Sequence, residues 1–100
     1  MAKVKHIALF KFKEGTSAEQ IDDIFNQVLD LSETVEGVED YVSGVNNSPE
    51  GLSKGFTHGF IMTFTDAAAR DAYLSNADHE RVKALILQHT EDALAFDFEL

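Results

Sequence analysis

The sequence predicts an α+β fold of the ferredoxin-like type, with an antiparallel four-stranded sheet that carries its helices on one face. Three observations support this prediction. The segments are read in the order βαββαβ, with period-two alternation along Val4–Phe12, Phe56–Phe64 and Ala93–Leu100 and helical spacing after Ser17. The 100 residues are enough for one compact domain and too few for two, so we expect residues 1–100 to form a single domain. Hydrophobic residues make up 44% and charged residues 26%, which is typical of a globular chain.

The first expected strand is Val4–Phe12, whose side chains alternate between two faces. Ser17 and Gln20 have the spacing of a capping box, so a helix is expected to follow Ser17. Glu36-Gly37 is expected to end that helix. The side chains that the helix is expected to bury are Ile21, Ile24, Phe25, Val28, Leu29 and Leu31.

The other strands are expected at Val38–Val45, Phe56–Phe64 and Ala93–Leu100. Between the last two lies a second helical region. Asp66 is expected to cap a helix over Ala67–Leu74. Ser75–Asp78 has the composition of a break and a new cap, after which a second helical segment is expected from about His79 to Gln88.

The predicted strands are apolar on both faces, although helices would cover only one of them. The uncovered face would hold the side chains Ile7, Leu9, Leu94, Phe96 and Phe98. A patch this large exceeds the apolar area of roughly a few hundred Å² that soluble monomers usually expose. We therefore expect these residues to join two copies into a homodimer through their sheets. The alternative is a monomer with an apolar surface.

Composition excludes several classes of function. The net charge is −10, which disfavours binding to nucleic acid or to an anionic membrane. The absence of cysteine excludes disulfides and thiolate chemistry. No glycine-rich nucleotide loop or nucleophile elbow occurs, so no cofactor is expected. The amino-terminal residues do not resemble a signal peptide and no apolar run is long enough to span a membrane, so the expected location is cytoplasmic.

Polar residues interrupt the apolar face beneath the expected helices. His6 and Asp97 are predicted at one end of the sheet and His58 at the other. The break before His79 allows that residue and Tyr73 to lean toward His6 and Asp97. A histidine base and a tyrosine hydroxyl in an apolar pocket could remove a proton next to a carbonyl group.

Two other interpretations of these polar residues remain open. His6 and Asp97 could be a buried pair in the core that satisfy each other's hydrogen bonds, since burying either alone would cost roughly several kcal/mol. A metal site made by His6, His79 and Asp97 is conceivable, but no short ligand spacing supports it, and no metal is expected.

Three segments, in order, resemble the stress-responsive A/B barrel (dimeric α/β-barrel, Dabb) family. They are Val4–Lys13, Gly55–Phe60, and Tyr73 with His79 six residues later. The likeness extends over essentially the whole chain. It implies a ferredoxin-like protomer whose sheet packs against that of a second copy, forming a dimeric α/β barrel.

The resemblance also implies a candidate site. Most family members have no assigned reaction, but one plant member is a cofactor-free polyketide cyclase with a Tyr and a His in its pocket. Tyr73 and His79 match these two residues. The polar residues around them there are matched by His6, His58 and Asp97.

Two features depart from that pattern. Asn76-Ala77 stands where the family often has a His-Pro pair, and the bulky Phe10 and Phe60 project into the expected pocket. Small side chains at Ala8, Ala93 and Ala95 leave space for a smaller ligand.

These observations leave three functional hypotheses. The first is a homodimer with a small, mostly apolar pocket that binds a small apolar or carbonyl ligand, or transforms it with His79 as base and Tyr73 orienting the carbonyl oxygen. The second is a non-catalytic stress-related or structural protein. The third, a cofactor-free monooxygenase, rests on analogy of fold alone.

Overall fold

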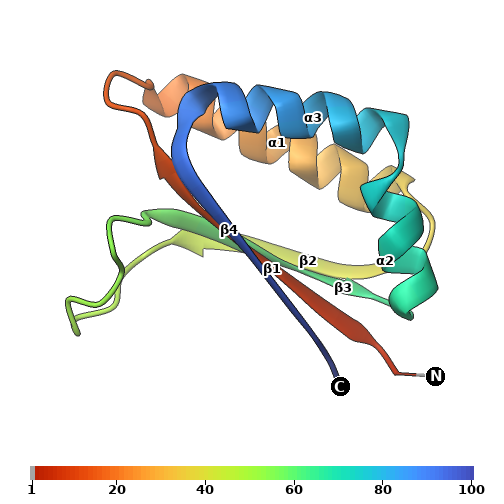
Figure 1. Cartoon of the computed structure of the whole chain (residues 1–100). Coiled ribbons are helices and arrows are strands. Elements are labelled where there is room, and N and C mark those ends of the chain that lie inside the picture. The colour runs from red at the N-terminus through yellow and green to blue at the C-terminus, as the bar shows by residue number, and fades with distance from the viewer. Residues whose placement is uncertain (1) are drawn as a thin grey trace.

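The computed structural model describes residues 2–100. Its elements are β1 (Val4–Phe12), α1 (Ala18–Thr34), β2 (Val38–Val45), β3 (His58–Phe64), α2 (Ala67–Leu74), α3 (Ala77–His89) and β4 (Thr90–Glu99). The strands form one antiparallel sheet in the order β2-β3-β1-β4. The helices lie over one face of this sheet, and the other face is uncovered (Figure 1). The predicted ferredoxin-like α+β fold is confirmed.

Several element boundaries differ from the prediction. β3 begins at His58 rather than Phe56. β4 begins at Thr90 rather than Ala93, because a register shift between Lys11 and Phe12 lets Phe12 pair with Thr90. α3 begins at Ala77, two residues before His79, because the side chain of Asn76 caps it. Asn76 Oδ1 accepts hydrogen bonds from the backbone N–H groups of Asp78 at 2.8 Å and His79 at 3.3 Å.

The amino-terminal helix begins as the sequence predicts. Ser17 Oγ accepts from the Gln20 N–H at 3.1 Å, and Gln20 Oε1 accepts from the Ser17 N–H at 2.9 Å. The expectation that Leu29 is buried is wrong, because its side chain is 42% exposed. Leu29 follows the buried Val28 by one residue, which turns it about 100° away from the stripe that faces the sheet.

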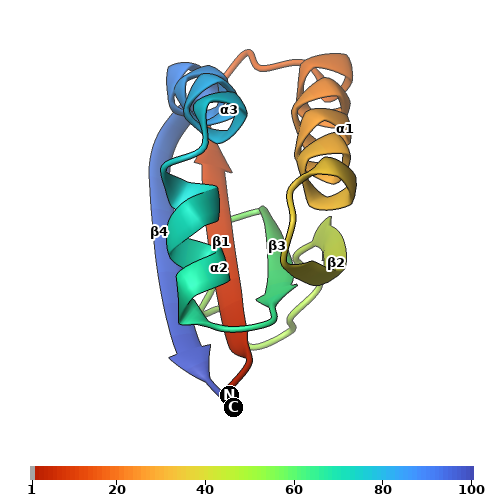
Figure 2. The ribbon, with the colours of Figure 1, turned by 90° about the vertical axis from the view of Figure 1, so that its right-hand side faces the viewer.

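A tight turn places α2 against the end of the sheet. Gly37 has φ of 93°, a left-handed conformation that favours glycine. A Cβ atom at Gly37 would lie 2.6 Å from Cβ of Ala69, so the absence of a side chain allows α2 to approach this turn closely. α2 therefore lies at one end of the layer, below the near end of α3 in Figure 2. This position directs Arg70 and Tyr73 toward the sheet.

Strand register separates the two faces of the sheet as predicted. His6 pairs with Asp97 on the face beneath the helices, and Ile7 pairs with Phe96 on the opposite face. The core between the sheet and the helices is made of Val4, Ala8, Phe10, Ile24, Val28, Leu31, Phe60, Met62, Phe64, Tyr73, Val82 and Ile86.

The uncovered face carries an apolar row that crosses all four strands. From β2 to β4, the row is Val42, Ile61, Ile7 and Phe96. The exposed fractions are 52% for Val42, 38% for Ile61 and 59% for Phe96. Leu94 and Phe98 beside the row are 43% and 44% exposed. A solvated sheet face is normally polar, so this one has the composition of a contact surface.

The helices of residues 2–100 are all too short or too polar to cross a lipid bilayer.

Candidate functional site

A cavity of about 250 Å³ lies between α3 and the helix-side face of β1 and β4. Its apolar lining is Ala8, Phe10, Val28, Phe60, Leu74, Val82, Ile86, Leu87, Ala93, Leu94 and Ala95. The polar groups that line it are His6, Tyr73, His79 and Lys83. Phe10 and Phe60 line the cavity without filling it, and small alanine side chains on β1 and β4 leave the space open.

His79 lies in the first turn of α3, and its ring orientation is set by one hydrogen bond. Nδ1 donates to the backbone carbonyl oxygen of Leu74 at 3.1 Å. Because a carbonyl can only accept, this bond places the proton of the neutral ring on Nδ1 and leaves Nε2 as the basic nitrogen. Burial lowers the pKa of His79, and the charge of Lys83 acts in the same direction, whereas the Leu74 carbonyl and Glu80 oppose the shift. His79 therefore has the protonation state of a general base at neutral pH.

Tyr73 packs directly against His79 across the break between α2 and α3. The ring centroids of the two residues are 4.4 Å apart. Burial raises the pKa of Tyr73 to about 12, with a smaller contribution from Tyr41. The hydroxyl consequently stays protonated at neutral pH and can donate a hydrogen bond to a carbonyl or enolate oxygen.

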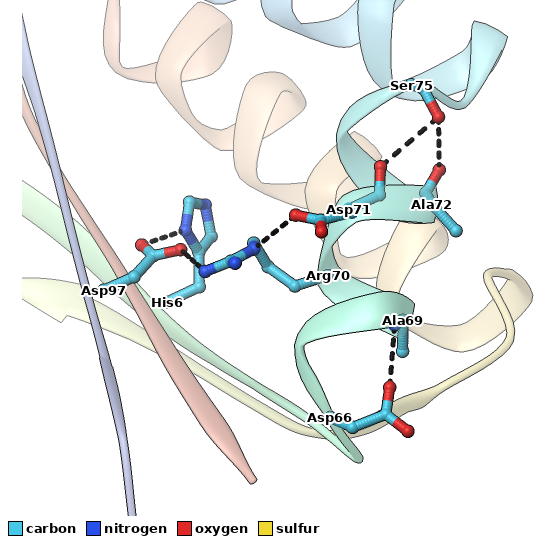
Figure 3. A network of polar contacts seen from close by, with 8 residues as sticks. All are labelled: His6, Asp66, Ala69, Arg70, Asp71, Ala72, Ser75 and Asp97. Atoms are coloured by element: carbon cyan, nitrogen blue, oxygen red, sulfur yellow. Dashed lines mark hydrogen bonds and ion pairs between the residues drawn. The ribbon is translucent and has the colours of Figure 1, made fainter. Parts of the chain in front are cut away.

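His6 is fixed by a chain of polar contacts that the sequence predicted only in part (Figure 3). Its Nδ1 lies 2.6 Å from Oδ1 of Asp97, and Oδ2 of Asp97 accepts from Nη1 of Arg70 at 3.0 Å. The side chains of His6 and Asp97 are 9% and 23% exposed. Arg70 thus compensates a largely buried carboxylate that would otherwise be costly to desolvate. The ring of His6 lies 6.2 Å from that of Tyr73, beside the catalytic candidates.

Arg70 and Lys83 are the polar site residues that sequence reasoning missed. Each had a signal in the spacing: Arg70 precedes Tyr73 by three residues, and Lys83 follows His79 by four. Residues three or four apart share a face of a helix. The helical positions of Tyr73 and His79 therefore predict that Arg70 and Lys83 lie beside them.

His58 does not join this group. It lies at the far end of the helix-side face, where it pairs with Phe10 in the β1–β3 register. Its ring packs against Phe12 and Phe25 at centroid distances of 5.2 Å and 5.9 Å, and burial lowers its pKa. His58 lines a separate hollow and not the cavity beside His79. The structure therefore brings together His6, Tyr73, His79 and Asp97, and leaves His58 apart.

Within residues 2–100, no three His, Asp or Glu side chains are grouped in a way that could hold a metal ion. Asp97 already accepts from His6 and Arg70, and Nδ1 of His79 is bound to a backbone carbonyl. The described residues instead form an acid–base pair beside an apolar cavity, which is suited to proton transfer.

Among proteins of similar sequence are two plant proteins. The stress-response A/B barrel domain-containing protein HS1 of Arabidopsis thaliana is 29% identical over 96% of this chain and 88% of its own length. Olivetolic acid cyclase of Cannabis sativa is 23% identical over 95% of this chain and 94% of its own.

Three solved structures are similar to this chain. The structure of At3g17210 from Arabidopsis thaliana superposes with a TM-score of 0.92 at 29% identity, covering 97% of this chain and 94% of its own. A dimeric ferredoxin-like protein from Jannaschia sp. CCS1 superposes with a TM-score of 0.89 at 24% identity, covering 98% of this chain and 99% of its own. The hydroxynitrile lyase from Passiflora edulis superposes with a TM-score of 0.91 at 21% identity, covering 98% of this chain and 93% of its own. The last two likenesses concern the fold alone.

The family model for the stress responsive A/B barrel domain matches residues 4–100. This match spans every strand and helix described above, including the cavity with Tyr73 and His79. The chain therefore belongs to the stress-responsive A/B barrel domain (Dabb) family.

Proposed function

We propose that the protein is a homodimer that binds a small, mostly apolar carbonyl compound in the cavity between α3 and the sheet. The observation that carries this proposal is the placement of Tyr73 and His79, with ring centroids 4.4 Å apart, on an otherwise largely apolar cavity of about 250 Å³. Apolar walls with a few convergent polar groups are typical of small-molecule sites. A stress-related role rests on the family description, and the cytoplasmic location stays a prediction.

The homodimer is supported by the uncovered sheet face. Its row of Val42, Ile61, Ile7 and Phe96 is apolar across the full width of the sheet. A second copy presents the same surface, and a two-fold interface needs only such self-complementarity. The Jannaschia protein of the same fold is described as dimeric, which agrees with this proposal.

The ligand proposal is tested with 4-phenylbutan-2-one, an apolar ketone, by ¹H–¹⁵N NMR titration. We expect saturable shifts at Tyr73, His79 and Ala95. Ala95→Phe places a ring in the cavity and should weaken binding by about tenfold or more. Ala72→Phe adds the same ring to the exposed side of α2 and is the matched control.

Two results would contradict the ligand proposal: unchanged affinity in the Ala95→Phe variant, or shifts confined to the uncovered face of the sheet. A protein that bound neither this ketone nor other small carbonyl compounds would favour the structural alternative, in which the polar cluster is part of the core.

The alternative function is cofactor-independent enzymatic proton transfer, and the tautomer of His79 favours it. In this step Nε2 of His79 removes a proton from the carbon next to a bound carbonyl group. The C–H electron pair forms the enolate double bond, and the hydroxyl of Tyr73 donates to the oxygen that gains charge. His6 is held beside the site by Asp97 and Arg70 as a supporting polar group. Olivetolic acid cyclase and the hydroxynitrile lyase have enzyme names, which is compatible with this alternative.

Deuterium exchange tests the enzyme alternative. In D₂O the protein should accelerate the exchange of the α-protons of 4-phenylbutan-2-one for deuterium. The exchange is measured by the loss of the α-proton signals in ¹H NMR. His79→Ala should lower that acceleration by about 10²- to 10⁴-fold, the usual contribution of a general base. Tyr73→Phe should lower it by about 10²-fold, because one donor to the developing oxyanion is lost. Equal exchange rates in the wild type and His79→Ala would refute catalysis, as long as both proteins retain similar melting temperatures.

A further inference from the structure

The charge of the cavity differs from that of the rest of the molecule. The protein has 18 acidic residues and a net charge of −10. None of the Asp or Glu residues belongs to the described lining of the cavity, which includes one lysine side chain, that of Lys83. A single lysine beside an apolar cavity is locally complementary to one negative charge on a ligand, although the net charge of the whole protein disfavours anions at long range.

Lys83 is positioned to act together with His79. The two residues are four apart on α3, so they share one face of the helix, about one turn from each other. The charge of Lys83 is close enough to contribute to the lowered pKa of His79, whose principal cause is burial. A ligand that contacts Tyr73 and His79 with one polar group can therefore reach Lys83 with another.

No carboxylate among residues 2–100 forms an ion pair with Lys83. Glu80 is the acid closest to His79, and its Oε1 lies 3.7 Å from Nδ1 of that ring. Nδ1 is the nitrogen bound to the Leu74 carbonyl, so Glu80 lies on the Nδ1 side of the ring. Glu80 is also 57% exposed and does not line the cavity.

The exposure of Lys83 fixes where the anion would lie. Lys83 is exposed to solvent and also lines the cavity, so it lies where the cavity meets solvent. A carboxylate placed there keeps part of its hydration, whereas a carboxylate deep in the apolar cavity would lose it at high cost.

We propose that the natural ligand is a carboxylate-bearing carbonyl compound, whose anionic group pairs with Lys83 at the mouth while its apolar part occupies the cavity. This inference rests on the proposed ligand-binding function and names the chemical class of that ligand. Lys83 is then a specificity-determining residue that selects carboxylates over neutral compounds of the same shape.

The test compares 4-phenylbutanoate with 4-phenylbutanamide, which have the same shape and differ in charge. Binding to the wild-type protein and to Lys83→Met is measured by NMR titration at low ionic strength. The wild type should bind the carboxylate about three- to tenfold more tightly than the amide, the range of a partly exposed ion pair. Lys83→Met should remove this preference by raising the Kd of the carboxylate, while the Kd of the amide changes less than about twofold.

Lys13→Met is the matched control, because it changes the net charge equally and Lys13 does not line the cavity. This variant should leave the preference intact. The inference is overturned if Lys83→Met weakens both compounds equally, or if Lys13→Met has the same effect as Lys83→Met. If the amide binds in the cavity as tightly as the carboxylate, only this inference fails. If neither compound shifts the signals of Tyr73 and His79, the ligand-binding proposal fails as well.

Discussion

A single backbone carbonyl decides the chemistry that His79 can perform. The bond from Nδ1 to the Leu74 oxygen, 3.1 Å long, selects the tautomer whose Nε2 is basic. Leu74 is the last residue of α2, where carbonyl groups lack helical partners. The end of one helix thus orients the imidazole in the first turn of the next.

The protonation of His79 gives a pH prediction. Because burial lowers its pKa, we expect its ring to titrate below the ordinary histidine value of 6.5 in a ¹H–¹⁵N NMR pH series. The unfolded chain binds this proton more readily than the folded chain. His79 should therefore make the free energy of unfolding fall as the pH decreases from 6.5 through its folded pKa. His79→Gln should reduce this part of the pH dependence, and a titration midpoint above 6.5 would contradict the assignment.

The break between α2 and α3 is the local feature that brings the two catalytic candidates together. On one straight helix, residues six apart would point about 240° away from each other, and Tyr73 and His79 could not share a cavity. Ser75 ends α2, and Asn76 begins α3 by capping it. The new helix brings the ring of His79 to 4.4 Å from that of Tyr73.

The cap at Asn76 can be separated experimentally from helix stability in general. Asn76→Ala and Ser17→Ala each remove one helix cap and should each lower the free energy of unfolding by about 1 kcal/mol. Only Asn76→Ala should also weaken ketone binding and reduce the NOE between the rings of Tyr73 and His79, because it alone loosens the first turn of α3. Equal ketone affinity in the two variants would show that the cap does not position His79.

At the scale of the whole molecule, the two faces of the sheet have different roles. The helix-side face forms the core and the cavity, and the uncovered face presents the apolar row that contains Phe96. Phe96 is 59% exposed in the protomer, so it contributes little to the stability of a single copy. The proposed homodimer accounts for its apolar character, because contact with a second copy would bury the ring.

Phe96→Asp tests this explanation of the uncovered face. The substitution should convert the dimer into a monomer of 11.1 kDa in sedimentation velocity, because it would bury a charge between two sheets. The melting temperature should fall only by the amount that association with the second copy contributes to stability. Leu29→Asp makes the same charge change at a side chain that is 42% exposed on α1, and it should leave the dimer intact. A wild-type protein that already sediments as a monomer would refute the homodimer.

The sequence by itself determined the order of the elements, the capping box at Ser17, and which side chains share a face of each strand. Alternation along β1 and β4 was sufficient to place His6 and Asp97 on one face and Ile7 and Phe96 on the other. These features depend on neighbours in the chain, so local periodicity and cap chemistry predict them.

Only the tertiary structure decided which of the polar residues meet. Arg70 reaches Asp97 because the tight turn at Gly37 allows α2 to pack against the end of the sheet, which is a contact between distant segments. His58 shares its face with His6 yet lies beside Phe12 and Phe25, away from the cavity. The volume of the cavity likewise depends on how closely α3 approaches β1 and β4. These distances come from the packing of whole elements, which periodicity within a single segment does not specify.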